Sequence, residues 1–560
     1  MSFLKINNLS IDYEMRRETI NAAKNINISV NRGEILGLVG ESGSGKSTVG
    51  NAIINLIDEP GKVSSGSIVL DGIDIYADLE NIINYRGKKI GLIFQDPQTS
   101  LNPILTIGEQ LIETIQTHLN LNINDSKNKA INLLKEVGIK DAKDRFNNYP
   151  HQFSGGMRQR VVISLALCCE PELLIADEPT TALDVSIQSQ ILDLIKKLAK
   201  ERNLAVILIT HDMGVIAETT NRVAVMKNGD LVEIGPTKEI LTKPKEIYTR
   251  SLVSSVPPTN KKISRFKIIE KENKSQSDTN IKILNRWEKK EINNKDLVKV
   301  KNLSKTFSDS FFIESTKNSV MAVNDVSFSI KEGEAFGLVG ESGSGKSTIA
   351  KMIVNLFKPS SGDIYFNDVC ITKIKSNKEM LKFRKQIQMI FQDPYSSLNG
   401  RLKVKDIIAE PIKLHRSSIT ASDLDSYIYD LLESVELSRQ SANRYPHEFS
   451  GGQRQRISIA RALATQPRLL VCDEPTSALD VSIQAQILNL LKDLQEQLNL
   501  TILFISHDLP VVRQMCDRIA VLKDGKLCEI SNTEDLFIKP THAYTKELLN
   551  LMPKIESIYK

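Results

Sequence analysis

The stretch GLVGESGSGKST occurs at Gly37–Thr48 and again, letter for letter, at Gly337–Thr348. Within it, GESGSGKS fits the pattern G-x-x-x-x-G-K-[ST], in which glycines let backbone N–H groups turn inward around an anion. Each copy follows an apolar run and precedes a helical pattern, so a helix N-terminus adds partial positive charge at the loop. The stretch therefore predicts a phosphate-binding loop, present twice.

In this pattern the lysine reaches the β- and γ-phosphates of a nucleotide and the serine after it contacts Mg²⁺. Lys46 and Ser47 take these roles in the first loop, and Lys346 and Ser347 in the second. The residues expected to surround the nucleotide are Gly40, Glu41, Ser42, Gly43, Ser44, Gly45, Lys46, Ser47 and Thr48, with Gly340, Glu341, Ser342, Gly343, Ser344, Gly345, Lys346, Ser347 and Thr348.

Four further stretches recur in the same order, with an offset of about 300 residues. They are Phe94–Pro103 with Phe391–Gly400, Tyr149–Arg160 with Tyr445–Arg456, Leu173–Gln188 with Leu469–Gln484, and Ile209–Asp212 with Ile505–Asp508. A period this long indicates a duplicated domain and not a solenoid. We expect domains at 1–258 and 297–560, separated by a linker at 259–296.

The linker is rich in Lys, Asn, Ser, Glu and Asp and has no sustained hydrophobic period, so we expect it to be flexible, with a short ordered piece around Trp287. Each half alternates short apolar runs with helical stretches, which predicts an α/β fold with a mainly parallel central sheet. SGSIVLDGIDIY and SGDIYFNDVCIT predict an antiparallel hairpin in each half, and the region between the FQDP and SGG stretches is helical in pattern.

Bulk properties narrow the possible functions. The formal charge of +5 comes from 73 basic and 68 acidic residues, which indicates a mixed solvated surface and no nucleic-acid partner. The N-terminal stretch has no apolar signal region, and no apolar run reaches the roughly 18–20 residues of a membrane helix. The six cysteines lack metal-ligand spacing and are expected to be reduced thiols.

Each half has an apolar strand that ends in an Asp-Glu pair: Asp177 and Glu178 in the first, Asp473 and Glu474 in the second. Strands of a parallel sheet end beside the phosphate loop. There the Asp can hold Mg²⁺ and the Glu can polarise the attacking water. A solvated turn is the alternative interpretation of such a pair.

Two more polar residues follow apolar strands in each half. Gln95 and Gln392 could touch Mg²⁺ or the water and report the nucleotide state to the adjoining helical region; a structural amide is the alternative. His211 and His507 end strands beside the expected phosphates and could contact the γ-phosphate; a core or capping histidine is the alternative.

A second anion-binding element follows the helical region. Ser154 and Ser450 are expected to be N-caps, each followed by two glycines that expose backbone donors at a helix start: Gly155 and Gly156, and Gly451 and Gly452. Each half then has two phosphate-binding elements for one triphosphate. A head-to-tail pairing of the halves would let each SGG element complete the other half's loop. ATP would close the pair, and hydrolysis would release it.

Taken together, the phosphate loop, the Gln, the SGG stretch, the apolar-Asp-Glu strand, the ALD turn and the His resemble the ATP-binding-cassette ATPase family, twice over. The resemblance implies a duplicated P-loop fold with a parallel core, an antiparallel β subdomain and a helical subdomain in each half. It implies that Tyr13 and Phe307 stack on adenine, that Asp184 and Asp480 communicate across the paired halves, and that Gln453 belongs to the second signature. Met157 replaces the Gln of the first signature, a small asymmetry.

FQDP…SLNP, YPHEFSGG and the tails at Pro236–Pro257 and Glu534–Pro553 resemble the peptide/nickel importer subfamily. That resemblance implies an ATP-hydrolysing subunit with ATP and Mg²⁺ as cofactors, peripheral on the cytoplasmic face of the inner (plasma) membrane. Its implied partners are two transmembrane permease subunits, contacted through the regions after Gln95 and Gln392, and an extracytoplasmic solute-binding protein. Since no Cys lies between Cys169 and Cys370, we expect no iron–sulfur cluster in the first tail.

The alternative is a soluble twin-cassette ATPase that acts on ribosomes as a translation factor. Such proteins resemble this chain in having two cassettes, but they place a long charged helical hairpin between the halves. The linker here is short and lacks a helical period, which favours the importer. The sequence does not identify the solute, because selectivity lies in the partners.

Overall fold

The structure is a computed structural model of the chain. It describes residues 2–16, 18–77, 82–97, 99–180, 183–267, 281–287, 295–308, 319–415, 420–477 and 479–552. Contacts divide the chain into two compact units, Met1–Ser254 and Ser255–Met552, each described here by itself. Residues 553–560, the end of the second predicted tail, lie outside the described ranges, and the predicted domain limits stay a prediction.

The first unit is built on one mixed sheet with the strand order β5-β4-β1-β2-β10-β9-β3-β8-β7-β6. Its central strands β3, β6, β7, β8 and β9 pair in parallel, whereas β1, β2, β4 and β5 pair antiparallel. One parallel pairing, Asp230 of β10 with Lys24 of β2, joins the two parts. The strands are β1 (Leu4–Glu14), β2 (Thr19–Val30), β3 (Ile35–Val39), β4 (Gly61–Leu70), β5 (Ile73–Asp74), β6 (Ile90–Ile93), β7 (Leu173–Asp177), β8 (Ala205–Ile209), β9 (Arg222–Lys227) and β10 (Asp230–Pro236).

The parallel strands are short, continuous apolar runs. Every residue of β3 and β8 is buried, as expected for strands covered on both faces. The helices around the sheet are α1 (Lys46–Ile53), α2 (Ile82–Tyr85), α3 (Ile107–Leu119), α4 (Ile123–Glu136), α5 (Ala142–Arg145), α6 (Gly155–Leu167), α7 (Val185–Glu201), α8 (Met213–Thr219), α9 (Thr237–Thr242) and α10 (Ile247–Ser254). The 3-10 turn η1 spans Pro150–Gln152.

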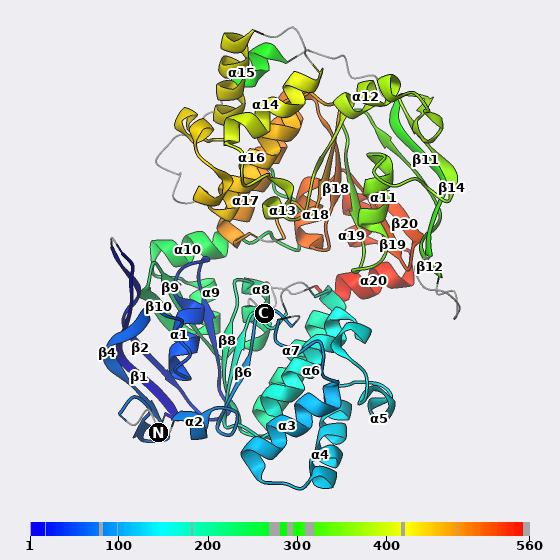
Figure 1. The fold of residues 1–560 in the computed structure, drawn as a ribbon. Helices are drawn as coiled ribbons and strands as arrows, with labels where there is room; N and C mark the ends of the chain where they lie inside the picture. The colour runs from blue at the N-terminus through cyan, green and yellow to red at the C-terminus, as the bar shows by residue number, and fades with distance from the viewer. Residues whose placement is uncertain are drawn as a thin grey trace. The chain divides into compact units, whose positions relative to one another are not determined.

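Helices α3, α4 and α6 form a separate helical region of the first unit, at the far end from β1, β2 and β4 (Figure 1). Thr106 caps α3: its side chain accepts from the Glu109 amide and the Glu109 carboxylate accepts from the Thr106 amide. This reciprocal cap sets where the helix begins. The predicted helical region and the predicted hairpin, observed as β4 and β5, are both confirmed.

The second unit repeats this architecture. Its parallel core has the strand order β16-β17-β18-β13-β19-β20, and its antiparallel sheet has the order β12-β11-β14-β15. The strands are β11 (Asp296–Ser308), β12 (Ser319–Lys331), β13 (Ala335–Val339), β14 (Ser361–Phe366), β15 (Val369–Cys370), β16 (Ile387–Ile390), β17 (Leu469–Asp473), β18 (Thr501–Ile505), β19 (Arg518–Lys523) and β20 (Lys526–Asn532).

The helices of the second unit follow the same order along the chain. They are α11 (Lys346–Ile353), α12 (Asn377–Gln386), α13 (Pro394–Ser397), α14 (Val404–His415), α15 (Ala421–Ser434), α16 (Gly451–Leu463), α17 (Val481–Leu498), α18 (Leu509–Met515), α19 (Thr533–Ile538) and α20 (Ala543–Asn550). The 3-10 turns are η3 (Lys282–Arg286), η4 (Ile371–Lys373), η5 (Arg439–Asn443) and η6 (Pro446–Glu448). None of the helices in the described ranges is long and apolar enough to cross a bilayer.

Part of the predicted flexible linker, 268–280 and 288–294, lies outside the described residues. The described part is not a free coil, in contrast to the expectation. Residues 258–267, which we call the strap, lie on α17 and α18 of the second unit. The Gln514 side chain donates to the carbonyls of Pro258 and Lys261 at 3.0 and 2.9 Å and accepts from the Ile263 amide at 2.7 Å.

The strap is ordered because its backbone groups find partners on these helices and because it buries an apolar side chain. Asn489 exchanges two hydrogen bonds with the backbone of Phe266, whose ring is buried in the core of the second unit. Further along, the expected ordered piece around Trp287 is confirmed as η3. The amide of Ile283 there donates to the Ser434 hydroxyl, and Trp287 is buried.

Candidate functional site

The first predicted phosphate loop lies between β3 and α1. The Lys46 side chain is buried within the loop, where its Nζ donates to the carbonyls of Gly40 and Glu41, both at 2.8 Å. Gly40 adopts a φ of +153°, and a Cβ there would lie 2.2 Å from the Met226 carbonyl oxygen, so no other residue fits. The loop therefore holds a cation beside inward-turned backbone groups, an arrangement suited to phosphate.

The second loop has the same geometry between β13 and α11. Lys346 Nζ donates to the carbonyls of Gly340 and Glu341 at 2.7 and 2.8 Å. Gly340 has a φ of +151°. The two loops thus agree in backbone conformation as well as in sequence.

The strand-end aspartates lie beside these loops. Ser347 Oγ donates to Asp473 Oδ1 at 2.9 Å. Burial raises the pKa of both Asp473 and Asp177, while hydrogen bonds from Ser347 and Ser47 act in the opposite direction. The buried Asp177 Oδ1 has no hydrogen-bond partner. A buried carboxylate oxygen beside a serine hydroxyl is suited to a hard divalent cation, so these residues fit Mg²⁺.

The glutamates that follow are held by two neighbours each. Gln95 Nε2 donates to Glu178 Oε2 at 2.7 Å, and His211 Nδ1 lies 3.0 Å from Glu178 Oε1. In the second unit, Gln392 and His507 make the same contacts to Glu474 at 2.8 and 3.1 Å. Residues far apart in sequence therefore meet at one carboxylate, at the carboxyl edge of each parallel sheet.

The backbone of these glutamates is unusual. Glu178 and Glu474 have φ angles of +46° and +47°, in the left-handed region that a non-glycine residue rarely adopts. Their amides donate at 2.9 Å to the carbonyls of Ile209 and Ile505, the last residues of the neighbouring strands. Strain at such positions often accompanies function, because surrounding contacts must maintain it.

Electrostatics favours a charged carboxylate here. Burial acts to raise the pKa of Glu474, but the hydrogen bond and charge of His507 and the charge of Lys346 outweigh it, so the pKa lies below its ordinary value. For His507, burial acts to lower the pKa, and the contact with Glu474 outweighs it and raises the pKa. The carboxylate is therefore available as a hydrogen-bond acceptor at neutral pH.

The SGG stretches lie elsewhere in each unit. Ser154 and Ser450 are N-caps, as predicted: their side chains accept from the amides of Met157 and Gln453 at 3.4 Å. Figure 1 shows α6 apart from α1, which the phosphate loop precedes. The structure thus gathers the Lys, Asp, Glu, Gln and His of each half, and it places the SGG element on the helical region.

In each SGG stretch the two glycines differ in surroundings. A Cβ on Gly156 would lie 2.7 Å from the Ile187 side chain, whereas one on Gly155 would meet nothing within 4 Å. In the second unit, a Cβ on Gly452 would lie 2.4 Å from Ile483. The second glycine is therefore required by packing in both stretches. The first is open at Gly155, whereas a Cβ on Gly451 would lie 3.6 Å from the Leu479 side chain.

The remaining predicted site residues lie on other elements. Tyr13 is half-buried in β1, and Phe307, in β11, is exposed and lies edge-on to Phe357 at a centroid distance of 5.7 Å. Asp184 and Asp480 precede α7 and α17, where they occupy the N-cap positions without a side-chain capping bond.

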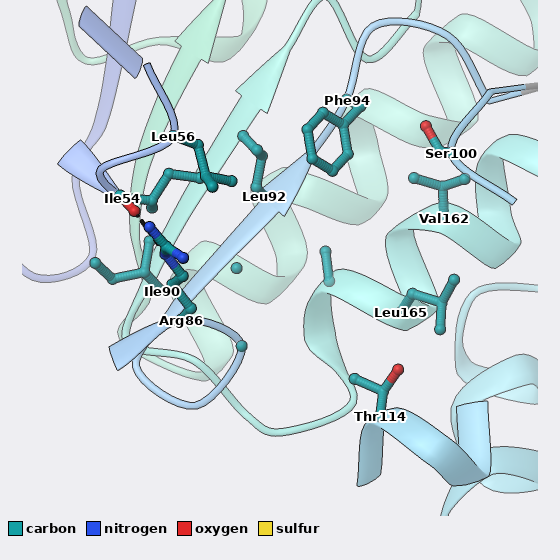
Figure 2. Close-up of a pocket in the computed structure, with 13 residues that line it drawn as sticks. Ile54, Leu56, Arg86, Ile90, Leu92, Phe94, Ser100, Thr114, Val162 and Leu165 are labelled. Carbon is teal, nitrogen blue, oxygen red and sulfur yellow. Dashed lines mark hydrogen bonds between the residues drawn. The ribbon is translucent and has the colours of Figure 1, made fainter. Parts of the chain in front are cut away.

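Two features near the site were not predicted. The tail tyrosines Tyr248 and Tyr544 contact the phosphate loops; the only sequence signal was the Tyr-Thr pair repeated in both tails. A pocket of about 280 Å³ lies between the sheet and the helical region, with Phe94, the residue before Gln95, in its lining. Figure 2 shows Leu92 and Phe94 on one side of it and Val162, Leu165 and Thr114 on the other. The sequence does not signal this pocket, because its walls come from distant elements.

Comparison with known proteins agrees with this geometry. The family described as "ABC transporter" matches residues 23–181 and 323–477. The family described as "Oligopeptide/dipeptide transporter, C-terminal region" matches residues 232–282 and 528–560, which include both tails and the strap. These matches favour the transporter over the ribosome-acting alternative.

The glutathione import ATP-binding protein GsiA of Shigella dysenteriae serotype 1 (strain Sd197) is 43% identical over 566 residues, which covers 99% of this chain and 90% of that protein. The protein of the same name from Escherichia coli (strain K12) is 42% identical over 570 residues, with the same coverage. Among solved structures, one match is a dimeric post-hydrolysis state of the ATP-binding cassette MJ0796 bound to ADP and Pi. Its sequence is 34% identical and its TM-score is 0.38. The match covers 42% of this chain and 98% of that chain. The family matches and the two relatives show that this chain belongs to the ABC transporter family, as an ATP-hydrolysing protein with two cassettes.

Proposed function

We propose that this chain energises a binding-protein-dependent importer of glutathione or short peptides, as a peripheral protein on the cytoplasmic face of the plasma membrane. The observation that carries the proposal is one arrangement present twice: a Gln, a Glu and a His meet at the end of a parallel sheet beside a phosphate loop, and an oligopeptide-type tail follows. The names of the relatives support glutathione as the first solute to test.

In each cassette the loop amides and the loop lysine bind the triphosphate. Ser47 and Asp177 in the first unit, and Ser347 and Asp473 in the second, would hold Mg²⁺, which would supply neutralising charge there. Glu178 and Glu474 orient the attacking water and accept its proton. His211 and Gln95, which both contact Glu178, hold that carboxylate in place. Tyr13 and Phe307 stack on adenine.

The two cassettes pair head-to-tail within the chain. Each open SGG backbone then binds the triphosphate held by the opposite phosphate loop, while Asp184 and Asp480 lie along the paired faces. ATP favours the closed pair because it bridges both halves, and hydrolysis removes that bridge. The exposed first glycine of the SGG stretch in the first unit, Gly155, supports this assignment.

Two permease subunits dock on the helical regions that follow Gln95 and Gln392, and an extracytoplasmic binding protein delivers the solute to them. The pocket of the first unit supports this, because it is lined mainly by apolar side chains and its rim carries Phe94, which is 48% exposed. Such a pocket suits an apolar anchor on a partner helix. Gln95 directly follows the pocket residue Phe94 and donates to Glu178, so it can connect docking with hydrolysis.

The decisive experiment measures uptake of labelled glutathione and of a labelled tetrapeptide in cells that lack this chain, complemented by variants. Glu178→Gln together with Glu474→Gln should keep ATP binding and lower ATP turnover at least about 100-fold, because the general base is lost. Uptake should then stop. Glu201→Gln, which changes an exposed glutamate at the end of α7, is the matched control and should leave both rates unchanged.

Steady-state hydrolysis by the double variant at the wild-type rate would remove the glutamates from the base role. Normal uptake of both labelled solutes in cells that lack the chain would contradict the proposed cargo. Recovery of ribosomes, in place of two permeases, with the purified chain would contradict the transport role.

A further inference from the structure

The tail of each cassette folds back onto its own phosphate loop. The amide of Glu41, the second residue of the loop pattern, donates to the Tyr248 hydroxyl at 3.2 Å. In the second unit the amide of Glu341 donates to the Tyr544 hydroxyl at 3.3 Å. Both tyrosines are buried, at 8% and 4% exposure, although they come from the first turn of a helix that ends its unit.

The residue that each tyrosine contacts also holds the loop lysine. The Glu41 carbonyl accepts from Lys46 Nζ at 2.8 Å, while the Glu41 amide is engaged by Tyr248. The two backbone groups of one residue therefore connect the tail to the cation of the loop. A rotation of this stretch of backbone would break both hydrogen bonds.

A lysine also lies over the ring of each tyrosine. Lys227, at the end of β9, places its Nζ 4.5 Å from the centroid of the Tyr248 ring. Lys523, at the end of β19, lies 4.3 Å from the Tyr544 centroid. A cation over the ring face adds attraction and limits the motion of the ring.

The start of each tail helix is fixed to the sheet by a carboxylate. Glu233 of β10 accepts from the amides of Lys245 and Glu246 at 3.0 and 3.2 Å. Glu529 of β20 accepts from the amides of Thr541 and His542 at 2.9 and 3.0 Å. These hydrogen bonds outweigh the effect of burial and lower the pKa of Glu529 to about 2, so this anchor stays charged.

The two tails share a Tyr-Thr pair, together with a preceding Lys-Pro pair and a leucine that follows. The first reads KEIYTRSL and the second THAYTKEL, so the Tyr-Thr pair recurs while most of its neighbours differ. The threonines Thr249 and Thr545 are buried at 0% and 1% exposure. The buried pair is therefore common to both tails, and its tyrosine contacts the phosphate loop in each unit.

We propose that Tyr248 and Tyr544 are positioning residues for ATP binding: each hydroxyl holds the phosphate loop of its own cassette in the conformation that receives the triphosphate. The tail then contributes to ATP binding in addition to packing against its unit. This inference rests on the proposed role of the loops in binding ATP.

The Tyr544 hydroxyl stays neutral at physiological pH, because its pKa is raised. Burial raises the pKa of Tyr544, and the nearby charge of Glu341 raises it further. A neutral hydroxyl can accept from the loop amide and still donate its own proton. Phenylalanine keeps the ring, the contact with the lysine and the packing, but leaves the loop amide without this acceptor. The loop then occupies its binding conformation for a smaller fraction of the time, which weakens the apparent affinity by that fraction.

The test compares Tyr248→Phe, Tyr544→Phe and the double variant in the full chain, using a fluorescent ATP analogue and steady-state hydrolysis. For the double variant we expect the Kd and KM for ATP to rise by about three- to tenfold, the effect of one lost hydrogen bond. The kcat should stay within about twofold, since the Gln–Glu–His arrangement is untouched. Each single variant should weaken one of the two sites.

Tyr427→Phe is the matched control. It also removes a buried tyrosine hydroxyl, which donates to the Ala464 carbonyl at 3.3 Å within the helical region of the second unit. It should leave the KM for ATP unchanged, whatever it does to the midpoint of thermal unfolding. A double tail variant whose KM equals that of Tyr427→Phe, or which lowers kcat at constant KM, would overturn the proposal.

Lys46→Ala with Lys346→Ala separates this inference from the proposed function. Loss of nucleotide binding in that variant supports the loops as the ATP sites, and the tyrosine variants then report on positioning. Retention of binding would contradict the loop assignment itself.

Discussion

The two cassettes agree closely at the nucleotide edge and differ in their helical regions. The Gln and His side chains lie 2.7 and 3.0 Å from the Glu178 carboxylate in the first unit. The corresponding distances to the Glu474 carboxylate in the second unit are 2.8 and 3.1 Å. Behind this edge, Leu165 of α6 lines an open pocket, whereas the equivalent residue of α16, Arg461, donates to the Ser397 carbonyl at 2.6 Å. The proposed reaction on ATP, common to both units, accounts for the shared geometry, and docking on different permeases would allow the helical regions to differ.

The signature helices differ in the same way. In the second unit the Gln453 side chain accepts from the Ser450 amide at 3.1 Å, completing a capping box. Met157 of the first unit cannot make that bond, although the Ser154 cap is present. Burial lowers the pKa of Arg461, against the opposing effect of Glu410, so its desolvation has a cost that the leucine of the first unit avoids.

Among the changes that distinguish the two helical regions, the largest expected effect comes from exchanging Leu165 and Arg461. Leu165→Arg should fill the pocket of the first cassette with a charged chain and reduce uptake of solute per ATP hydrolysed by roughly tenfold, the size of a lost interface anchor. ATP hydrolysis by the isolated chain should change little. Leu165→Met, which keeps an apolar side chain, is the control for the measurement of uptake in reconstituted vesicles.

Arg461→Leu is the reciprocal substitution, in the second unit. If the helical regions of the two cassettes bind different permeases, this change should impair docking at the second cassette alone. Equal loss of both permeases from the purified complex would show that the two docking sites are not independent.

The strap distinguishes the second unit, and Arg265 is its main ionic contact, with Asp493 Oδ1 at 2.8 Å and Glu496 Oε2 at 2.7 Å from its Nη2. Arg265→Ala should lower the free energy of unfolding of the second unit by about 1–3 kcal/mol, because Asp493 is left mostly buried without this cation. Trp287 is the only tryptophan of the chain, so its fluorescence reports on this unit. Arg202→Ala, which breaks the surface pair with Glu136 in the first unit, should not move that transition.

The smallest expected effect is a pH dependence. Lys492 Nζ donates to the carbonyls of Ile263 and Ser264, and burial, aided by the charges of Arg265 and Lys262, lowers its pKa to about 8. Because the unfolded chain keeps its lysine protonated up to about pH 10.4, it binds more protons than the folded chain between pH 8 and that value. Stability of the second unit should therefore rise over this window, on the order of 1–2 kcal/mol after solvent screening.

Urea unfolding followed by Trp287 fluorescence at pH 7.5 and pH 9.5 measures this change. Lys492→Met removes the titrating group and should abolish the rise. A rise of the same size in that variant would assign the effect to another group. With Arg265→Ala, these measurements show how much of the difference between the units lies in the strap.

Much of the nucleotide site could be predicted because its residues stand in local patterns. The loop, the strand-end carboxylates and the capping serines each depend on a few neighbouring positions whose backbone conformation the sequence specifies. The strap could not be predicted in this way. Its composition is that of a linker, and its order comes from Gln514, Asn489 and Arg513 on helices more than 200 residues further along the chain.

The difference between the two helical regions could not be predicted from local sequence either. Leu165 and Arg461 both suit a helix, and only the surroundings of each side chain distinguish them. The same holds for Tyr248, which as bare sequence indicates nothing more than a packing helix.

The sequence by itself determined that this chain has two phosphate loops, two signature helices and two parallel sheets, because backbone geometry at glycines, caps and apolar runs is a short-range property. Only the tertiary structure decided that Gln95, Glu178 and His211 meet at one carboxylate, that the tail returns to the loop through Tyr248, and that the strap belongs to the second unit. Those contacts join residues far apart in the chain, and they form because buried polar groups require partners wherever the fold supplies them.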